Sequence, residues 1–180
     1  MVFDYDKSIQ VLERTPKILK ELLSGLSDDW VLHNEGGDTW SPYDVMGHLV
    51  HGERTDWMNR LEIILSDQGN KTFIPFDRFA QFKESEGKSI LQLLDEFESL
   101  RKTNLDRISN MHLSANDFKR KGIHPAFGEV TMTQLLSTWT VHDLTHLGQV
   151  TRVMAKQYQS EIGPWIKYFR QLQSQAGANQ

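Results

Sequence analysis

Two histidines, His142 and His146, lie four residues apart in a stretch that reads as helix. Residues i and i+4 of an α-helix share one face, with Cβ atoms about 5–6 Å apart, so two imidazole rings can bind one ion through bonds of about 2.0–2.1 Å. The pair also continues an apolar stripe and should face the protein interior. That stripe comprises Leu135, Trp139, His142, His146, Val150 and Val153.

A catalytic metal site of the zinc type has three protein ligands and one open position, so a third ligand is needed. His48 lies near the apolar stripe of an earlier helical segment and should face the same interior. His51 falls about one residue off that stripe, and we expect a surface or edge position for it. We therefore choose His48. The alternative for each interior histidine is a core residue satisfied by a hydrogen bond.

The neighbours of His48 are compatible with a site. Gly47 and Gly52 flank it and leave room for an ion, its water and a substrate. The sequence has seven histidines. Those in predicted connectors are less constrained candidates, namely His33, His112 and His124.

The stretch from His142 to His146 also resembles the H-E-x-x-H motif of zinc peptidases, with Asp143 in place of the glutamate. Aspartate is one methylene shorter and reaches a metal-bound water less easily as a general base. A peptidase of that type takes its third ligand from downstream, where the sequence offers Glu161, and it needs strands that this pattern does not predict. We therefore favour the three-histidine site. Asp143 is then a solvated helix residue or a hydrogen-bond partner that orients a neighbouring side chain.

Four amphipathic segments must position these histidines. The first spans about residues 6–24, where Pro16 predicts a kink near Thr15 or two short helices in line, and Gly25 predicts the end. The second begins at 40–42, because Ser41 can cap and Asp44 can close a capping box, and it ends near 66–69. On it, we interpret three charged residues as a solvated face with i, i+4 charge pairs: Glu53, Arg54 and Arg60.

The third segment has one apolar side from Ile90 to Ile108. A capping box at 131–134 opens the fourth, which carries His142 and runs to about Gln157. Gly163-Pro164 breaks it, and residues 165–172 form a short closing helix. Residues 70–87 are interpreted as a long ordered loop whose aromatic residues cover an end of the core. Residues 111–130 form a second connector with a short extended pair.

These segments predict an all-α protein, a four-helix bundle with long connectors and a short C-terminal helix. The connectors leave open whether the helix order is simply up and down or uses crossovers. We expect one domain over residues 1–173 and a frayed tail over 174–180.

Composition excludes several classes of function. The chain of 180 residues has a net charge of −4 and no basic cluster, which argues against a nucleic-acid partner. It has no cysteine, hence no disulfide, no thiolate ligand and no cysteine nucleophile. The N-terminal residues do not resemble a signal peptide, and no apolar run is long enough to span a membrane. We therefore expect a cytoplasmic protein.

Taken in order, these motifs resemble the DinB/YfiT-like metalloprotein superfamily, of the DinB-like domain type, over nearly the whole chain. Each motif alone is weak, whereas the set in this order and spacing is fairly specific. The matching residues are Gly-Leu-Ser-Asp-Asp at 25–29, Trp40-Ser41, His48-Leu49, Glu53-Arg54, Trp57-x-x-Arg60-Leu61, Phe76-Asp77-Arg78 and His142-x3-His146-Leu147-Gly148-Gln149.

The resemblance implies a four-helix bundle, often a homodimer, with a divalent metal held by His48, His142 and His146. The metal in such proteins is usually zinc or nickel. Better-understood relatives are thiol-dependent enzymes that use a low-molecular-weight thiol as cosubstrate, and others are described as metal-dependent hydrolases. We therefore expect S-transferase-type chemistry on a small electrophile, in which the ion binds the thiolate. The alternatives are a metal-dependent hydrolase and a non-catalytic metal- or ligand-binding bundle.

Overall fold

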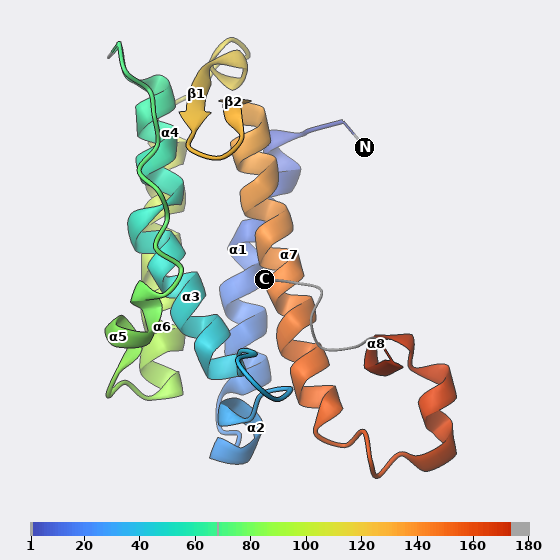
Figure 1. The fold of residues 1–180 in the computed structure, drawn as a ribbon. Coiled ribbons are helices and arrows are strands. Elements are labelled where there is room, and N and C mark those ends of the chain that lie inside the picture. Colours follow the sequence, from blue (N-terminus) through green and yellow to red (C-terminus); the bar gives the residue numbers. More distant parts are fainter. Residues whose placement is uncertain (1, 68, 174–180) are drawn as a thin grey trace.

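Four long helical segments dominate the computed structural model, which describes residues 2–67 and 69–173 (Figure 1). This confirms the predicted all-α four-helix bundle. The described helices and strands are α1 (Tyr5–Leu23), α2 (Asp28–Leu32), α3 (Pro42–Thr55), α4 (Trp57–Leu65), α5 (Ala80–Ser85), α6 (Ile90–Asn110), a 3₁₀ turn at Asp117–Lys119, β1 (Lys121–His124), β2 (Gly128–Thr131), α7 (Met132–Lys156), a second 3₁₀ turn at Gly163–Tyr168 and α8 (Arg170–Gln173).

The helix order uses crossovers. Helix α1 packs against α6 and α7, and α3 packs against the same two helices, so α1 and α3 lie across the bundle from each other. In Figure 1, α1 and α7 run in one direction, and α3, α4 and α6 run in the other. The chain after α4 accordingly returns along the whole bundle before α6 begins. These long connections resolve the topology that the sequence left open.

The predicted helix starts are present and have the expected chemistry. Ser41 accepts a hydrogen bond from the backbone of Asp44, whose side chain accepts one from the backbone of Ser41, which is a complete capping box. Thr131 and Gln134 form the same arrangement at the start of α7. A third capping box, at Ser89 and Gln92, opens α6. Gly25 has φ +76° just beyond α1, where a left-handed residue ends a helix.

Pro16 lies inside one continuous helix, so of the two predicted alternatives, a kink near Thr15 or two short helices in line, the second was wrong. Proline has no N–H to donate to the carbonyl four residues earlier, here that of Leu12. The buried guanidinium of Arg101 donates to that carbonyl from α6, with Nη1 2.8 Å from Leu12 O. A side chain from another helix therefore replaces the hydrogen bond that Pro16 removes.

Two other boundaries differ from the prediction. The second helical segment is interrupted at Asp56, which has φ −113° and ψ −69° and separates α3 from α4. The backbone bonds from Asp56 N to Gly52 O and from Arg60 N to Asp56 O, both 3.0 Å, nevertheless continue across the interruption. The closing helix predicted over 165–172 is instead a 3₁₀ turn followed by the four-residue α8. The predicted tail, 174–180, lies outside the described residues.

The two connectors are more structured than the sequence indicated. The hairpin β1–β2 confirms the extended pair predicted in 111–130, and Phe73 N donates to Ile123 O, which attaches the first connector to it. Residues 70–87 contain α5, so this connector is not simply a loop. Phe73 is buried in the core as expected, but Phe79 and Phe82 are exposed.

A polar layer divides the core. One apolar cluster includes Leu61, Ile108 and Trp139, and the other includes Leu19, Leu49 and Phe97. Between them, each bundle helix contributes buried polar side chains: Thr15 from α1, Glu53 from α3, Arg101 and Asn104 from α6, and Asp143 from α7. The histidines of the candidate site lie on α3 and α7 close to this layer. Among the described residues, no helix combines the length and hydrophobicity needed to cross a membrane.

Glu35 links the connector before α3 to the far end of α7. Its carboxylate accepts two hydrogen bonds from Arg152, both 2.9 Å, and lies 3.1 Å from Lys156 Nζ. Burial raises the pKa of Glu35, but the hydrogen bonds from Arg152 and Lys156 lower it by more, so the pKa lies below its usual 4.5. The ionised carboxylate of Glu35 therefore stabilises the fold above about pH 4.5. This contribution is lost as the pH falls through the lowered pKa of Glu35.

We accordingly expect Glu35→Gln to lower the free energy of unfolding by about 2 kcal/mol near neutral pH, with a smaller loss below about pH 4. Urea unfolding of both proteins across this pH range measures the difference. Glu129→Gln is the control, because Glu129 pairs with Lys121 on the surface and should change stability little at any pH. A Glu35→Gln effect that is the same at every pH would contradict the assignment.

Candidate metal centre

Three imidazoles converge between α3 and α7. His142 Nε2 lies 3.0 Å from His48 Nε2 and 3.1 Å from His146 Nε2. One ligand atom of each ring falls within 4.8 Å of the others, which makes the three histidines a group that could hold a metal ion. The structure therefore brings together the three residues selected from the sequence. His142 occupies the middle of the triad.

The three rings are neutral nitrogen donors at physiological pH. Burial lowers the pKa of His48 to about 3, and electrostatic interactions with His146, His51 and Arg78 lower it further. Burial also lowers the pKa of His142 and of His146. His146 Nδ1 lies 2.8 Å from Gln149 Oε1, and because that oxygen only accepts, Nδ1 carries the proton and Nε2 presents its lone pair. Metal ligation requires this neutral form.

The unsatisfied Nδ1 atoms of two rings argue against an assignment of these residues as ordinary core histidines. The Nδ1 atoms of His48 and His142 are buried with no hydrogen-bond partner among the described residues. A histidine retained for packing normally has its ring nitrogens satisfied. The Nε2 atoms on the other side of the rings approach one another to 3.0 and 3.1 Å, which costs free energy unless a cation or a shared proton lies between them. The donor set thus fits a divalent ion with three nitrogen ligands and an open position.

Aromatic side chains surround the triad. The Trp40 ring lies 4.9 Å from the His48 ring and stacks at 6.5 Å on His146. Phe76, from the connector before α5, meets His48 edge-on at 5.5 Å. Trp57 meets His142 edge-on at 5.1 Å. These rings limit the access of water and lower the local dielectric, so a charge at the centre interacts strongly with its neighbours.

A buried ionic cluster connects α3 and α7, the two helices that carry the three histidines, to α6. Arg101 is bidentate to Asp143, with Nη1–Oδ2 2.6 Å and Nη2–Oδ1 2.9 Å, and its Nη2 also donates to Glu53 Oε1 at 2.8 Å. Trp139 Nε1 donates to the same Glu53 oxygen, and Asn104 donates to the other. Two carboxylates share one guanidinium, so the cluster has excess negative charge beside a site for a cation.

This cluster corrects two interpretations of the sequence. Glu53 is 3% exposed and does not belong to a solvated face. Asp143 is fully buried and paired with Arg101, so of its two predicted roles the solvated one was wrong and the hydrogen-bonding one is confirmed. Because Asp143 adjoins His142 in α7, its attachment to Arg101 restricts the rotation of the helix that carries two of the three histidines.

His51 was predicted to lie at the surface or edge, and this was wrong. It is 5% exposed, with Nδ1 3.1 Å from Glu84 Oε2. Phe76 lies against both His48 and His51, with ring centroids 5.5 Å and 5.0 Å away. His51 nevertheless stays outside the triad, as does Glu161, the ligand that a peptidase would require. The third histidine comes from α3, upstream of the pair, which rejects the peptidase arrangement.

Sequence comparison decides the family. A profile described as the DinB superfamily matches residues 11–150. The chain belongs to the DinB superfamily. No curated protein sequence matches this DinB-superfamily chain. The match to the family profile confirms the resemblance inferred from the ordered motifs.

Solved structures agree with the DinB-superfamily fold. YfiT from Bacillus subtilis, described as a probable metal-dependent hydrolase with an unusual four-helix bundle topology, superposes with a TM-score of 0.71 at 21% identity, covering 88% of this chain and 87% of its own. TT2238, described as a four-helix bundle protein, gives a TM-score of 0.57 at 18% identity, covering 82% of this chain and 98% of its own. At these identities, the likeness establishes the fold.

Several residues of the centre were not predicted from the sequence. Trp40 was assigned to a helix start and Phe76 to a loop that covers an end of the core, and nothing in their spacing placed their rings over His48. Gln149 could have been found, because it lies three residues after His146 on the same helix face. Arg101 could not, since its partners are 42 and 48 residues away in the chain.

Proposed function

We propose that this protein is a divalent-metal-dependent enzyme in which His48, His142 and His146 hold the ion. The observation that carries this proposal is the convergence of three neutral imidazole Nε2 atoms, two pairs of which lie at 3.0 and 3.1 Å. With three nitrogen ligands, a tetrahedral ion keeps one position for a reactant. Zinc and nickel are the metals that we expect, because imidazole nitrogens suit both.

The reaction that we favour is transfer of a small thiol to an electrophilic small molecule. The bound ion would supply a Lewis acid that lowers the pKa of a thiol or of water at the open position. The sulfur then forms a bond to the electrophilic carbon, the leaving group departs with its electron pair, and the thiol proton goes to solvent. The chain has no cysteine, so the thiol must come from a cosubstrate.

The side chains around the triad support this choice. Asp143, the carboxylate next to His142 in the chain, is held by Arg101 on the side of the ionic cluster, so it is not available as a general base. Trp40 and Phe76 give an apolar wall, which suits a polarisable sulfur nucleophile. A thiolate that is already formed needs no general base in the step that makes the carbon–sulfur bond.

Hydrolysis is the second candidate, and one observation favours it. YfiT, with the same fold, is described as a probable metal-dependent hydrolase. In that reaction water would take the place of the thiol, and a proton donor for the leaving group would be required. A homodimeric assembly and a cytoplasmic location stay predictions, which light scattering and cell fractionation test.

Metal analysis and activity assays on protein purified without an affinity tag distinguish these functions. Metal analysis comes first, since less than about 0.2 ion per chain, with no recovery on adding zinc or nickel, would contradict both enzymatic reactions. With a filled site, we expect conjugation of a thiol to a model electrophile to be faster than hydrolysis of a model ester. The reverse order assigns the protein as a hydrolase. Inactivity in both assays, with no thermal stabilisation by thiols, assigns it as a binding protein.

A further inference from the structure

Two of the three candidate ligands lack the hydrogen bond that normally orients a metal-binding imidazole. A histidine that binds a metal through Nε2 usually donates its Nδ1–H to a carboxylate, a carbonyl oxygen or a water, and this bond fixes the ring. His146 has such a bond, to Gln149 Oε1 at 2.8 Å. The Nδ1 atoms of His48 and His142 are buried without a partner among the described residues. Other contacts must therefore orient these two rings.

Side chains from two connectors orient the ring of His48. The rings of Trp40, from the connector before α3, and Phe76, from the connector before α5, contact it with centroids 4.9 and 5.5 Å away. The first connector is attached to α7, because Arg152 donates to the carboxylate of Glu35 at 2.9 Å. Trp40 therefore lies on a segment that is itself held in place.

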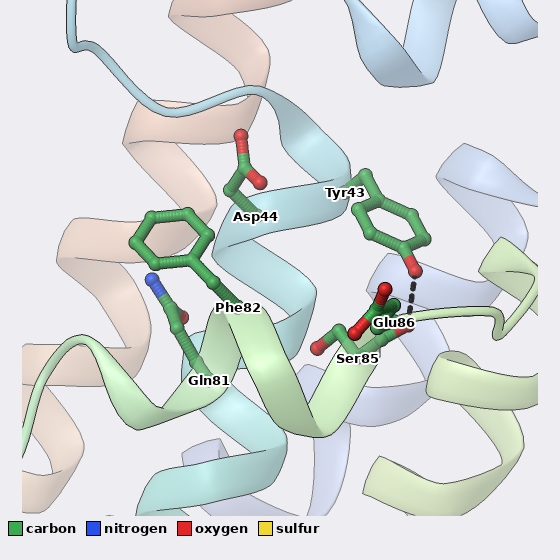
Figure 2. Close-up of a pocket in the computed structure, with 6 residues that line it drawn as sticks. All are labelled: Tyr43, Asp44, Gln81, Phe82, Ser85 and Glu86. Carbon is green, nitrogen blue, oxygen red and sulfur yellow. Dashed lines mark hydrogen bonds between the residues drawn. The ribbon is translucent and has the colours of Figure 1, made fainter.

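Helix α5 attaches the second connector to α3. Tyr43 donates its hydroxyl to Ser85 O at 2.6 Å (Figure 2). A Cβ on Gly47 would clash with Ser85 Oγ, so Gly47 makes room for α5 and not for the ion, as the sequence suggested. The hollow of about 130 Å³ beside α5 has none of the three histidines in its lining. This side of the centre supports His48 and leaves the ring of His142 to other contacts.

Trp57 is the ring that contacts His142. The two rings meet edge to face, with centroids 5.1 Å apart and an interplanar angle of 71°. Within residues 2–67 and 69–173, no other aromatic ring from outside the triad contacts His142. Trp57 Nε1 lies 3.4 Å from the position that a Cβ on Gly52 would occupy. The indole therefore lies against α3, one turn after His48, as well as against α7.

The ionic cluster fixes Trp57 in turn. The Trp57 ring stacks on Trp139, with centroids 5.6 Å apart and an interplanar angle of 10°. Trp139 Nε1 donates to Glu53 Oε1 at 2.9 Å, and Arg101 Nη2 donates to the same oxygen at 2.8 Å. Both indoles are buried, so neither can turn without displacing closely packed neighbours. A continuous series of contacts thus runs from Glu53 to His142.

We propose that Trp57 is a positioning residue for His142, and that its edge-to-face contact replaces the missing hydrogen bond at Nδ1. The χ2 torsion of histidine has broad minima, so a ring without a hydrogen bond rotates unless its neighbours prevent it. Rotation would carry Nε2 of His142 away from His48 and His146, and Trp57 blocks that rotation. This inference rests on the metal site proposed above and explains how that site keeps its geometry.

Zinc affinity separates this role from simple packing in the core. Competition with a chromophoric chelator gives the Kd of zinc under conditions in which each protein is fully folded. We expect Trp57→Leu to bind zinc at least about tenfold more weakly, because loss of a contact that orients a ligand costs about 10–100-fold in affinity. Trp57→Phe keeps an aromatic edge and should lose less than about threefold. If Trp57→Leu does not fold, Trp57→Met replaces it with the same expectation, since methionine fills an irregular gap without a ring.

Phe73→Leu is the matched control. Phe73 is 2% exposed and belongs to the same apolar cluster as Trp57, but it contacts Arg60 and His124 instead of the triad. The substitution should lower the Tm and leave the Kd of zinc within about twofold of wild type. The visible spectrum of cobalt-loaded protein reports ligand geometry, so its bands should change in Trp57→Leu and stay unchanged in Phe73→Leu.

Wild-type protein that binds neither zinc nor cobalt would overturn the metal site itself, and this inference with it. If wild type binds zinc, an unchanged Kd in Trp57→Leu would overturn the positioning role alone. An equal loss of zinc affinity in Trp57→Leu and Phe73→Leu, or in Trp57→Leu and Trp57→Phe, would do the same. Weak binding in Trp57→Leu that Trp57→Phe restores, with normal binding in Phe73→Leu, would establish the role.

Discussion

Replacing Arg101 by methionine is expected to lower the free energy of unfolding by about 3–5 kcal/mol, because it leaves two buried carboxylates without their cation. It also removes the donor to Leu12 O, a carbonyl that Pro16 already deprives of its helical hydrogen bond. The guanidinium links α6, which carries it, to the other three bundle helices through Leu12 of α1, Glu53 of α3 and Asp143 of α7. Urea unfolding followed by circular dichroism measures the loss.

Arg107→Met is the matched control, since Arg107 lies on the same helix and pairs with Glu62 at the surface, where each side chain is 45% exposed. Its effect should stay within about 0.5 kcal/mol. Arg101→Met combined with Glu53→Gln and Asp143→Asn should recover part of the stability, because no buried charge then lacks a partner. This combined variant also keeps the prediction testable if the single variant does not fold. A loss of less than about 1 kcal/mol in Arg101→Met would show that the cluster does not hold the helices.

The position of this cluster explains why the bundle tolerates polar residues at its centre. Arg101 lies between the rings of Phe97 and Trp139, at 4.9 and 5.2 Å, so its flat faces are packed while its edges hydrogen-bond. Burial lowers the pKa of Arg101, but the adjacent charges of Glu53 and Asp143 raise it by more. A charged layer of this kind favours one register of α3, α6 and α7, since sliding any of these three helices would leave a charge unpaired.

Local chemistry made the helices predictable from sequence. Capping boxes at Ser41 and Thr131 are formed by residues three positions apart, and the apolar stripe through Trp139 and Val150 follows the helical repeat. The same periodicity selected His48, His142 and His146, because a residue on an apolar stripe faces the interior whatever its partner. The long-range contacts had no such signal.

The two errors about burial on the second helical segment share one cause. Glu53 and His51 were assigned to the outside of their helix because charged and imidazole side chains usually lie there. Each is buried because a partner from a distant segment covers it: Arg101 of α6 for Glu53 and Glu84 of α5 for His51. The helix α5 was itself missed, because its buried residues are polar and its aromatic residues are exposed, opposite to the pattern that identifies a surface helix.

His142→Ala is expected to abolish metal binding, because His142 is the residue whose Nε2 approaches both other ligands. His48→Ala and His146→Ala should each lose the metal as well, since two nitrogens rarely hold a divalent ion against competition from solvent. Metal analysis after dialysis gives the stoichiometry, and thermal unfolding with added zinc or nickel gives an independent measure. A ligand at about 100 times its Kd stabilises a protein by about 2.7 kcal/mol, so wild type should show a clear increase in Tm and the three variants should show none.

His51→Ala separates ligation from the mere presence of a buried imidazole on α3. His51 is as buried as His48 and lies three residues away, but its Nδ1 faces Glu84 and its ring is outside the triad. The variant should therefore keep its metal and its metal-dependent increase in Tm, although it loses some stability with the Glu84 contact. Full metal retention by His48→Ala together with metal loss in His51→Ala would show that the third ligand is His51 and not His48. Because α3 carries both rings on neighbouring turns, the two outcomes differ by the rotation of one helix about its axis, which the Arg101 bond to Glu53 opposes.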